Sequence, residues 1–172
     1  VGTGRGAANG ILIKSAEALE TAHSVQAVVL DKTGTITQGR PVVTDVICRE
    51  GVSDERLLQI AASLEKLSEH PLAGAVVEEA RWREIPLLPA EDFDQIAGQG
   101  VRGTVDGSAC LAGNRRMMDA FSVSTAELDA DRLAAEGKTA LYFAVDGRLL
   151  GVIAVADVVK PTSRQAVQEL RE

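Results

Sequence analysis

Short apolar runs separated by turn signals predict a fold that mixes strands and helices. Residues 25–30 are Val-rich and end at Asp31, which is typical of a short buried strand. Residues 42–47 form a second candidate strand after Pro41, and residues 11–22 form a candidate helix. In open α/β sheets, a carboxylate at a strand end lies where the chemistry takes place. Asp31 is therefore the first candidate functional residue.

A helical hairpin is predicted over residues 53–80. Ser53 precedes two acidic residues, which is typical of a helix start. Apolar residues then follow at helical spacing: Leu57, Ala61, Leu64 and Leu67. Pro71 suits the first turn of a second helix and leaves His70 near its N-cap. The apolar side of that helix consists of Leu72, Ala75, Val76 and Ala80.

Two Asp-Gly pairs predict β-hairpins in the second half of the chain, because Asp-Gly between strand-like runs is a typical hairpin turn. The pair at 106–107 joins residues 101–105 to 110–112, and the pair at 146–147 joins residues 140–145 to 149–155. Between the hairpins, Ser124 and Glu127 form a capping box, which predicts a helix that ends at Gly137.

The order of these elements predicts that one module is inserted into another. Antiparallel hairpins with helices between them indicate an α+β module over residues 42–148. Residues 1–41 and residues 149–172, which return to a buried strand and a helix start, are expected to belong to a second, α/β layer. Because residue 172 falls inside that last helix, we expect the sequence to be part of a larger domain.

Composition narrows the class of protein. Of the 172 residues, 45% are hydrophobic and 25% are charged, which is normal for a globular protein. The net charge of −7 disfavours a nucleic-acid partner. The longest apolar run, 149–156, is too short to span a membrane, and no secretory signal opens the chain. Cys48 and Cys110 form no CxxC pair, so we expect two structural thiols in a reducing compartment.

The segment Asp31-Lys32-Thr33-Gly34-Thr35-Ile36-Thr37 carries the strongest chemical signal. A carboxylate at a strand end can attack a phosphoryl group and form an aspartyl phosphate. Lys32 and the amides of the glycine turn can hold phosphate oxygens. Haloacid-dehalogenase-class phosphatases usually carry a second Asp, a general acid and base, where this chain has Thr33. Since Thr cannot perform that role, the phosphoenzyme is expected to be long-lived, as an ion pump requires.

This segment resembles the phosphorylation signature of P-type ATPases, and three further segments resemble motifs of the heavy-metal branch in the right order. They are Ser68-Glu69-His70-Pro71, Gly98-Gln99-Gly100-Val101-Arg102-Gly103 and Gly113-Asn114. The resemblance covers essentially the whole chain. It implies an α+β nucleotide-binding domain, with an antiparallel sheet and helical hairpins, inserted in a partial α/β haloacid-dehalogenase-like phosphorylation domain.

The resemblance also implies the site residues and the cofactors. It assigns catalysis to Asp31, Lys32 and Thr33, and it implies that Asp31 and Thr33 bind Mg2+ together with acidic residues further along the family's chain. It assigns ATP binding to Glu65, His70, Gly98, Gly100 and Asn114. The transmembrane and actuator domains of the same longer chain are the implied partners. The implied location of these residues is the cytoplasmic face of a membrane.

Each proposed nucleotide contact has a physical rationale and an ordinary alternative. The His70 imidazole can stack on adenine, and Glu65 can accept a hydrogen bond from the adenine amino group. Glycines 98 and 100 allow close approach of a flat ligand, and Asn114 offers both a donor and an acceptor. Taken alone, His70 and Asn114 are also ordinary helix caps, and Glu65 is an ordinary exposed helix charge.

Three alternatives remain open. The transported metal is copper by overall likeness, but zinc and cadmium pumps are close relatives. The second alternative to a metal pump is a soluble haloacid-dehalogenase-like phosphatase. The third is a nucleotide-binding module that catalyses no reaction. The Thr-Gly-Asp and Gly-Asp-Gly loops that complete the family's phosphorylation site do not occur here. We therefore expect these 172 residues to bind nucleotide without turning it over.

The GxGxxG at 98–103 is not followed by a clear helix, which argues against a Rossmann site.

Overall fold

The computed structural model describes residues 2–128 and 130–171, which divide into two units, Val1–Lys32 and Thr33–Glu172. The first unit contains two short helices, α1 (Gly2–Ala8) and α2 (Ala16–Ala22), and neither buries a residue. Helix α2 begins after Ser15, whose hydroxyl accepts a hydrogen bond from the Ala18 N–H at 3.1 Å. The helix predicted over residues 11–22 is therefore confirmed only in its second half.

The prediction of a buried strand at residues 25–30 was wrong. These residues form no strand, they are exposed, and Val29 is 96% exposed. A strand is stable only when its backbone groups are paired. No strand in the described part of the chain pairs with this segment, so its apolar pattern is not enough to order it.

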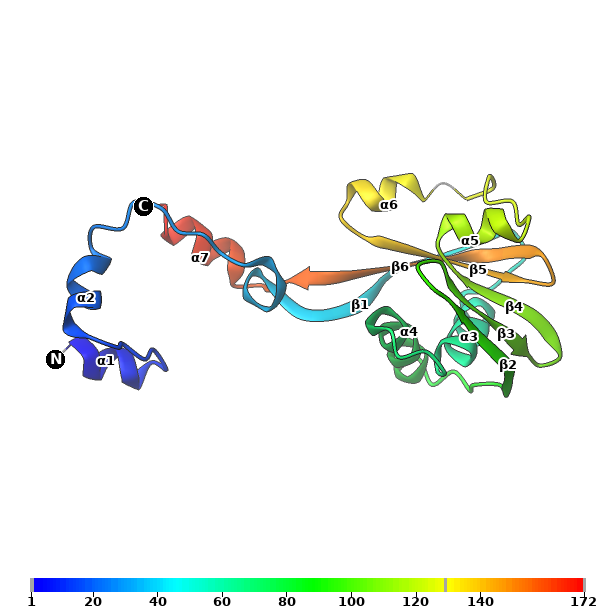
Figure 1. Cartoon of the computed structure of the whole chain (residues 1–172), viewed down its shortest axis with the longest axis horizontal. Helices are drawn as coiled ribbons and strands as arrows, with labels where there is room; N and C mark the ends of the chain where they lie inside the picture. Colours follow the sequence, from blue (N-terminus) through cyan, green and yellow to red (C-terminus); the bar gives the residue numbers. More distant parts are fainter. Residues whose placement is uncertain (1, 129, 172) are drawn as a thin grey trace. The chain divides into compact units, whose positions relative to one another are not determined.

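The second unit is built on a six-stranded antiparallel sheet in the order β1-β6-β5-β4-β3-β2 (Figure 1). Its strands are β1 (Thr37–Cys48), β2 (Ala90–Ile96), β3 (Gly100–Val105), β4 (Ser108–Gly113), β5 (Thr139–Val145) and β6 (Arg148–Val159). The two predicted hairpins are present as β3–β4 and β5–β6. Strands β1 and β6 continue as a two-stranded ribbon toward α7 (Ser163–Glu169) (Figure 1).

Helices cover both faces of this sheet (Figure 1). The predicted hairpin of α3 (Asp54–Glu65) and α4 (Pro71–Trp82) packs on one face, where Leu57, Leu58 and Val76 are fully buried. Helices α5 (Arg115–Ala120) and α6 (Asp131–Ala135) lie on the other face, around Met117, Met118 and Leu133. The two apolar clusters make the sheet the rigid centre of this unit.

Two local predictions need correction. The helix before Gly137 begins at Asp131, because the Ser124 hydroxyl accepts from the Ala126 N–H at 3.4 Å and closes a turn instead of a capping box. Strand β2 was not predicted at all. A bulge between Glu91 and Asp94 breaks the alternation of apolar and polar residues on which strand prediction depends.

Other expectations agree with the structure. Cys48 is half-buried, Cys110 is buried, and both are free thiols. Residues 98–103 lead through a turn into β3, so the Rossmann interpretation fails as expected. Within the described residues, no helix is long and apolar enough to cross a membrane. The proposed module limits fall inside β1 and at the first residue of β6, and the division into 1–41, 42–148 and 149–172 stays a prediction.

Candidate functional site

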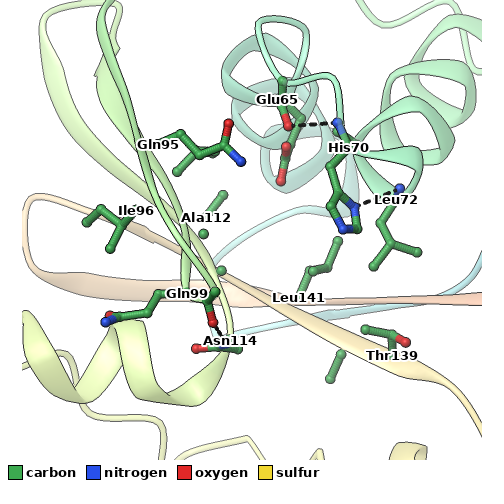
Figure 2. Close-up of a pocket in the computed structure, with 17 residues that line it drawn as sticks. Glu65, His70, Leu72, Gln95, Ile96, Gln99, Ala112, Asn114, Thr139 and Leu141 are labelled. Carbon is green, nitrogen blue, oxygen red and sulfur yellow. Dashed lines mark hydrogen bonds between the residues drawn. The ribbon is translucent and has the colours of Figure 1, made fainter.

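A cavity of about 310 Å3 lies between the helical hairpin and the sheet. Its walls come from the end of α3, the start of α4, the β2–β3 turn, the end of β4 and the start of β5. All five residues expected to bind nucleotide line it: Glu65, His70, Gly98, Gly100 and Asn114. Figure 2 shows Glu65 and His70 on the helical side, facing Gln99 and Asn114 across the cavity. The fold therefore brings together residues that lie up to 49 positions apart. That they bind nucleotide stays a prediction.

Glu65 is the last residue of α3 and only 7% exposed. Burial disfavours the charged carboxylate and raises the pKa of Glu65 to about 7, and a hydrogen bond with Ser68 lowers that pKa in part. The ordinary alternative for this residue, an exposed helix charge, is therefore excluded by its burial. A carboxyl group that changes charge near neutral pH lines the cavity and can accept a hydrogen bond from a ligand.

His70 caps the N-terminus of α4. Its Nδ1 accepts a hydrogen bond from the Leu72 N–H at 3.2 Å, and its own backbone N–H donates to the Ser68 hydroxyl at 3.3 Å (Figure 2). The bond at Nδ1 orients the ring, and the backbone bond holds the residue in the cavity lining. Because Nδ1 is occupied by the cap, the ring face and Nε2 remain for a ligand.

The β2–β3 turn brings bare backbone to the cavity wall. Gly98 has φ +70°, a conformation that side chains rarely adopt. A Cβ at Gly100 would lie 2.1 Å from the Ala112 carbonyl oxygen and 2.5 Å from the Gly113 Cα. Only glycine allows β3 and β4 to approach this closely, so strand packing by itself requires glycine at position 100. That Gly98 and Gly100 allow the close approach of a flat ligand stays a prediction.

Asn114 is the N-cap of α5, with its Oδ1 accepting from the Met117 N–H at 3.1 Å. Its Nδ2 donates to the Gly98 carbonyl oxygen at 2.9 Å. The side chain is therefore already bonded on both sides by the protein.

Several lining residues were missed by sequence reasoning, among them Gln95, Ile96, Thr139 and Leu141. Gln95 and Ile96 belong to β2, which was itself not predicted. Leu141 belongs to the strand predicted over residues 140–145, and Thr139 is the residue before it, at the start of β5. Strand prediction alone does not indicate which strand ends meet which helix. Their signal would have been the alignment of β5 with β4, which only the sheet order provides.

Asp31, Lys32 and Thr33 are all exposed, and the boundary between the two units falls between Lys32 and Thr33. The catalytic roles of these three residues stay predictions. The turn that follows, residues 34–39, is held by hydrogen bonds to residues near the end of the chain. Asp157 accepts from the Thr37 hydroxyl and from the Gly39 N–H at 2.9 Å, and Ser163 donates to the Ile36 carbonyl oxygen at 2.7 Å.

The described residues do not form a complete magnesium site. Magnesium is usually bound by about six oxygen ligands, some of them from water. Among residues 2–128 and 130–171, no group of three or more His, Cys, Asp or Glu side chains could hold a metal ion. Asp31 and Thr33 would supply only a small part of the oxygen ligands that the ion needs.

Comparison with known proteins gives consistent results. A family profile described as haloacid dehalogenase-like hydrolase matches residues 25–172. The copper-transporting ATPase 1 of Rhizobium meliloti (strain 1021) is 45% identical over 174 residues, which cover 100% of this chain and 21% of that protein. The chain thus spans about a fifth of the length of the curated relatives it matches.

Solved structures agree with the sequence relatives. A zinc-transporting PIB-type ATPase in the E2.Pi state superposes with a TM-score of 0.84 at 31% identity, covering 99% of this chain and 28% of that chain. The N-domain of HMA6, a copper-transporting P-type ATPase, superposes with a TM-score of 0.56 at 28% identity. That match covers 68% of this chain and 99% of the N-domain, so a domain solved on its own corresponds to about two thirds of the chain.

Proposed function

The chain belongs to the haloacid dehalogenase-like hydrolase family, and we propose that it is the nucleotide-binding and phosphorylation-site part of a copper-exporting P-type ATPase. One observation carries the proposal. Five residues selected from the sequence as nucleotide contacts, Glu65, His70, Gly98, Gly100 and Asn114, all line the same cavity. They come from separate elements, so a chance clustering would require several independent coincidences.

The chemistry of the cavity favours the adenine end of ATP. Its lining holds one carboxyl group, one imidazole, exposed glycine backbone and apolar groups such as Leu72 and Leu141. A flat base can pack against apolar groups and the imidazole, while Glu65 accepts from its exocyclic amino group. The lining residues include neither Lys nor Arg, which are the usual partners of phosphate. The triphosphate therefore extends out of the cavity.

In the proposed pump, ATP is the substrate and Asp31 receives its γ-phosphoryl group. Thr33 in place of a second carboxylate favours a long-lived aspartyl phosphate, which argues against the soluble phosphatase alternative. The transmembrane and actuator domains of a longer chain are the proposed partners, and the cytoplasmic face of a membrane is the proposed location. The Mg2+ expected with ATP would need ligands beyond those that Asp31 and Thr33 provide.

Copper is favoured over zinc and cadmium by the sequence relatives. The relatives of 42–48% identity are described as copper-transporting or copper-exporting ATPases. The zinc-transporting ATPase superposes well but is only 31% identical. ATP hydrolysis by the full-length protein that is stimulated by copper and not by zinc would support copper as the transported metal. Stimulation by zinc and not by copper would favour zinc instead.

Calorimetric titration of the 172-residue chain with ATP tests the nucleotide site. Loss of the His70 ring should weaken binding roughly 5- to 150-fold, as expected for one or two good contacts of about 1–3 kcal/mol. His70→Asn is the sharper variant, because Asn retains the cap of α4 and removes only the ring. His70→Gln should lose similar affinity.

The same titration distinguishes adenine recognition from phosphate recognition. ADP and AMP should bind within about tenfold of ATP if the base supplies most of the free energy. GTP should bind more weakly, because guanine presents a carbonyl oxygen where adenine presents its amino donor. Equal ATP affinity in the wild type and in both His70 variants would contradict the proposed site.

A further inference from the structure

Asn114 joins two segments that meet at the cavity wall. Its Nδ2 donates to the Gly98 carbonyl oxygen at 2.9 Å, and its backbone N–H donates to the Gln99 carbonyl oxygen at 2.9 Å. Its Oδ1 accepts from the Met117 N–H at 3.1 Å in the first turn of α5. The orientation of the amide follows from these neighbours, since a backbone N–H needs an acceptor and a carbonyl oxygen needs a donor.

Strand pairing closes the ends of the turn that Asn114 holds, because Gly100 lies opposite Ile96 of β2 and opposite Gly113 of β4. Within the turn, the Gln99 N–H donates to the Ile96 carbonyl oxygen at 3.0 Å. Gly98 has no side chain, and an ideal Cβ there would meet no atom within 4 Å. The turn is therefore not packed into place at Gly98. The bond from the Asn114 Nδ2 to the Gly98 carbonyl oxygen adds a contact at the tip of the turn, beyond the strand pairing at its ends.

We propose that Asn114 is a positioning residue, which sets the backbone of Gly98 and Gln99 at the cavity wall instead of binding the nucleotide through its amide. This differs from the ligand contact expected from the sequence. Both polar groups of the side chain have protein partners, the Met117 N–H for Oδ1 and the Gly98 carbonyl oxygen for Nδ2, so the observed geometry directs the amide at the protein backbone. The proposal rests on the proposed function only in that its ligand is an adenine nucleotide.

Two substitutions distinguish the two roles of the Asn114 side chain, which caps α5 and bonds the Gly98 carbonyl oxygen. Asn114→Ser keeps an N-cap acceptor but has no donor that reaches Gly98. Asn114→Asp keeps the cap and the shape, but it places a carboxylate oxygen against the Gly98 carbonyl oxygen. Ser and Asp are comparable helix caps. If capping were the whole role, both variants would behave alike, whereas the proposed role makes Asn114→Asp the weaker binder.

Two measurements on the 172-residue chain test the proposal. The first is amide hydrogen exchange without nucleotide, followed at the Gln99 and Asn114 N–H groups, whose acceptors are Ile96 and Gln99. We expect faster exchange at both amides in Asn114→Ser and faster still in Asn114→Asp. The second is titration with adenosine, AMP and ATP, where we expect a loss of about fivefold to tenfold in Asn114→Ser that is the same for all three ligands.

A matched control is Ser53→Ala, which removes the N-cap of α3 and lies outside the cavity lining. It should lower thermal stability. The exchange rates of the Gln99 and Asn114 amides and the affinities for the three ligands should stay unchanged. Thermal melting of every variant identifies any that fails to fold, and Asn114→Ser then serves as the milder of the pair.

Three results would overturn the proposal. Weaker binding with unchanged exchange in the free protein would mean that Asn114 contacts the ligand directly. A loss that appears only with phosphorylated ligands would mean the same for ribose-phosphate contact. Faster exchange with unchanged affinity would mean that the turn need not be held. If the wild-type chain binds no adenine nucleotide, the proposed function fails, while the exchange data still decide whether Asn114 holds the turn.

Discussion

The cavity around His70 and the segment around Asp31 differ in what builds them. The cavity takes its walls from two helices and four strands, and each wall is anchored in a buried core. The segment 31–37 is continuous in the sequence, and its first three side chains are exposed. A binding site made by many elements is complete once its domain folds, whereas a contiguous motif acquires its geometry only from whatever packs around it.

The second half of that segment also takes its geometry from residues that pack around it. Residues 34–39 are ordered where polar groups from the end of β6 and the start of α7 bind them. The Lys160 ammonium donates to the Gly34 carbonyl oxygen, and Ser163 donates to the Ile36 carbonyl oxygen. Order in this turn therefore comes from residues about 120 positions later in the chain, as in the Thr37–Asp157 bond.

The largest expected effect tests how strictly the cavity depends on its packing. Gly100→Ala places a Cβ within 2.5 Å of backbone atoms on β4, which cannot move without breaking the strand pairing. We expect a loss of about 3 kcal/mol or more in unfolding free energy, and ATP binding too weak to measure. Urea unfolding and calorimetry provide the measurements. The control is Gly74→Ala in α4, where no atom lies within 4 Å and stability should hold or rise. A wild-type melting temperature in Gly100→Ala would contradict the packing argument.

The buried carboxyl of Glu65 should make the stability of the cavity depend on pH. Its pKa is raised from 4.5 to about 7 in the folded protein, so its contribution is fully favourable below pH 4.5 and is lost as pH rises through 7. That shift corresponds to roughly 3 kcal/mol between pH 4.5 and pH 8. Glu65→Gln should remove this part of the pH dependence, as measured by urea unfolding at several pH values. Parallel pH profiles for the two proteins would show that Glu65 is not the group responsible.

The turn after Asp31 can be loosened without touching the cavity. Asp157→Ala removes the acceptor of the Gly39 N–H and of the Thr37 hydroxyl. We expect a loss of about 1–2 kcal/mol in unfolding free energy and faster hydrogen exchange at Gly39, with ATP affinity unchanged. Asp146→Ala is the matched control, because Asp146 accepts from the Ala109 N–H at 3.0 Å in a distant hairpin. If both variants affected Gly39 equally, the local role of Asp157 would be disproved.

The smallest expected effect separates the two regions most directly. Asp31→Asn should change ATP affinity less than twofold, because neither Asp31 nor any residue before Glu65 lines the cavity. Titration of the variant beside wild type measures this. A loss comparable to that of the His70 variants would mean that the two regions form one binding site.

Local sequence patterns predicted the parts of the fold where short-range physics dominates. The cap at His70, the start of α3 at Ser53 and the two Asp-Gly hairpins follow from side chains that bond or turn their own neighbourhood. Residues 25–30 failed because an apolar run is a strand only beside a partner. Strand β2 was missed because a bulge hides its alternation.

The sequence by itself determined which residues are proposed to carry chemistry: a carboxylate with its phosphorylation-like motif, and five candidate nucleotide contacts in order. Only the tertiary structure decided that those five share one cavity and that Glu65 is buried. It also decided that the Asn114 side-chain amide is hydrogen-bonded to Gly98 and Met117. The physical reason is that residue type fixes what a group can donate, accept or attack. Burial and hydrogen-bond partners instead depend on strands and helices far apart in the chain, which the order of the sheet brings together.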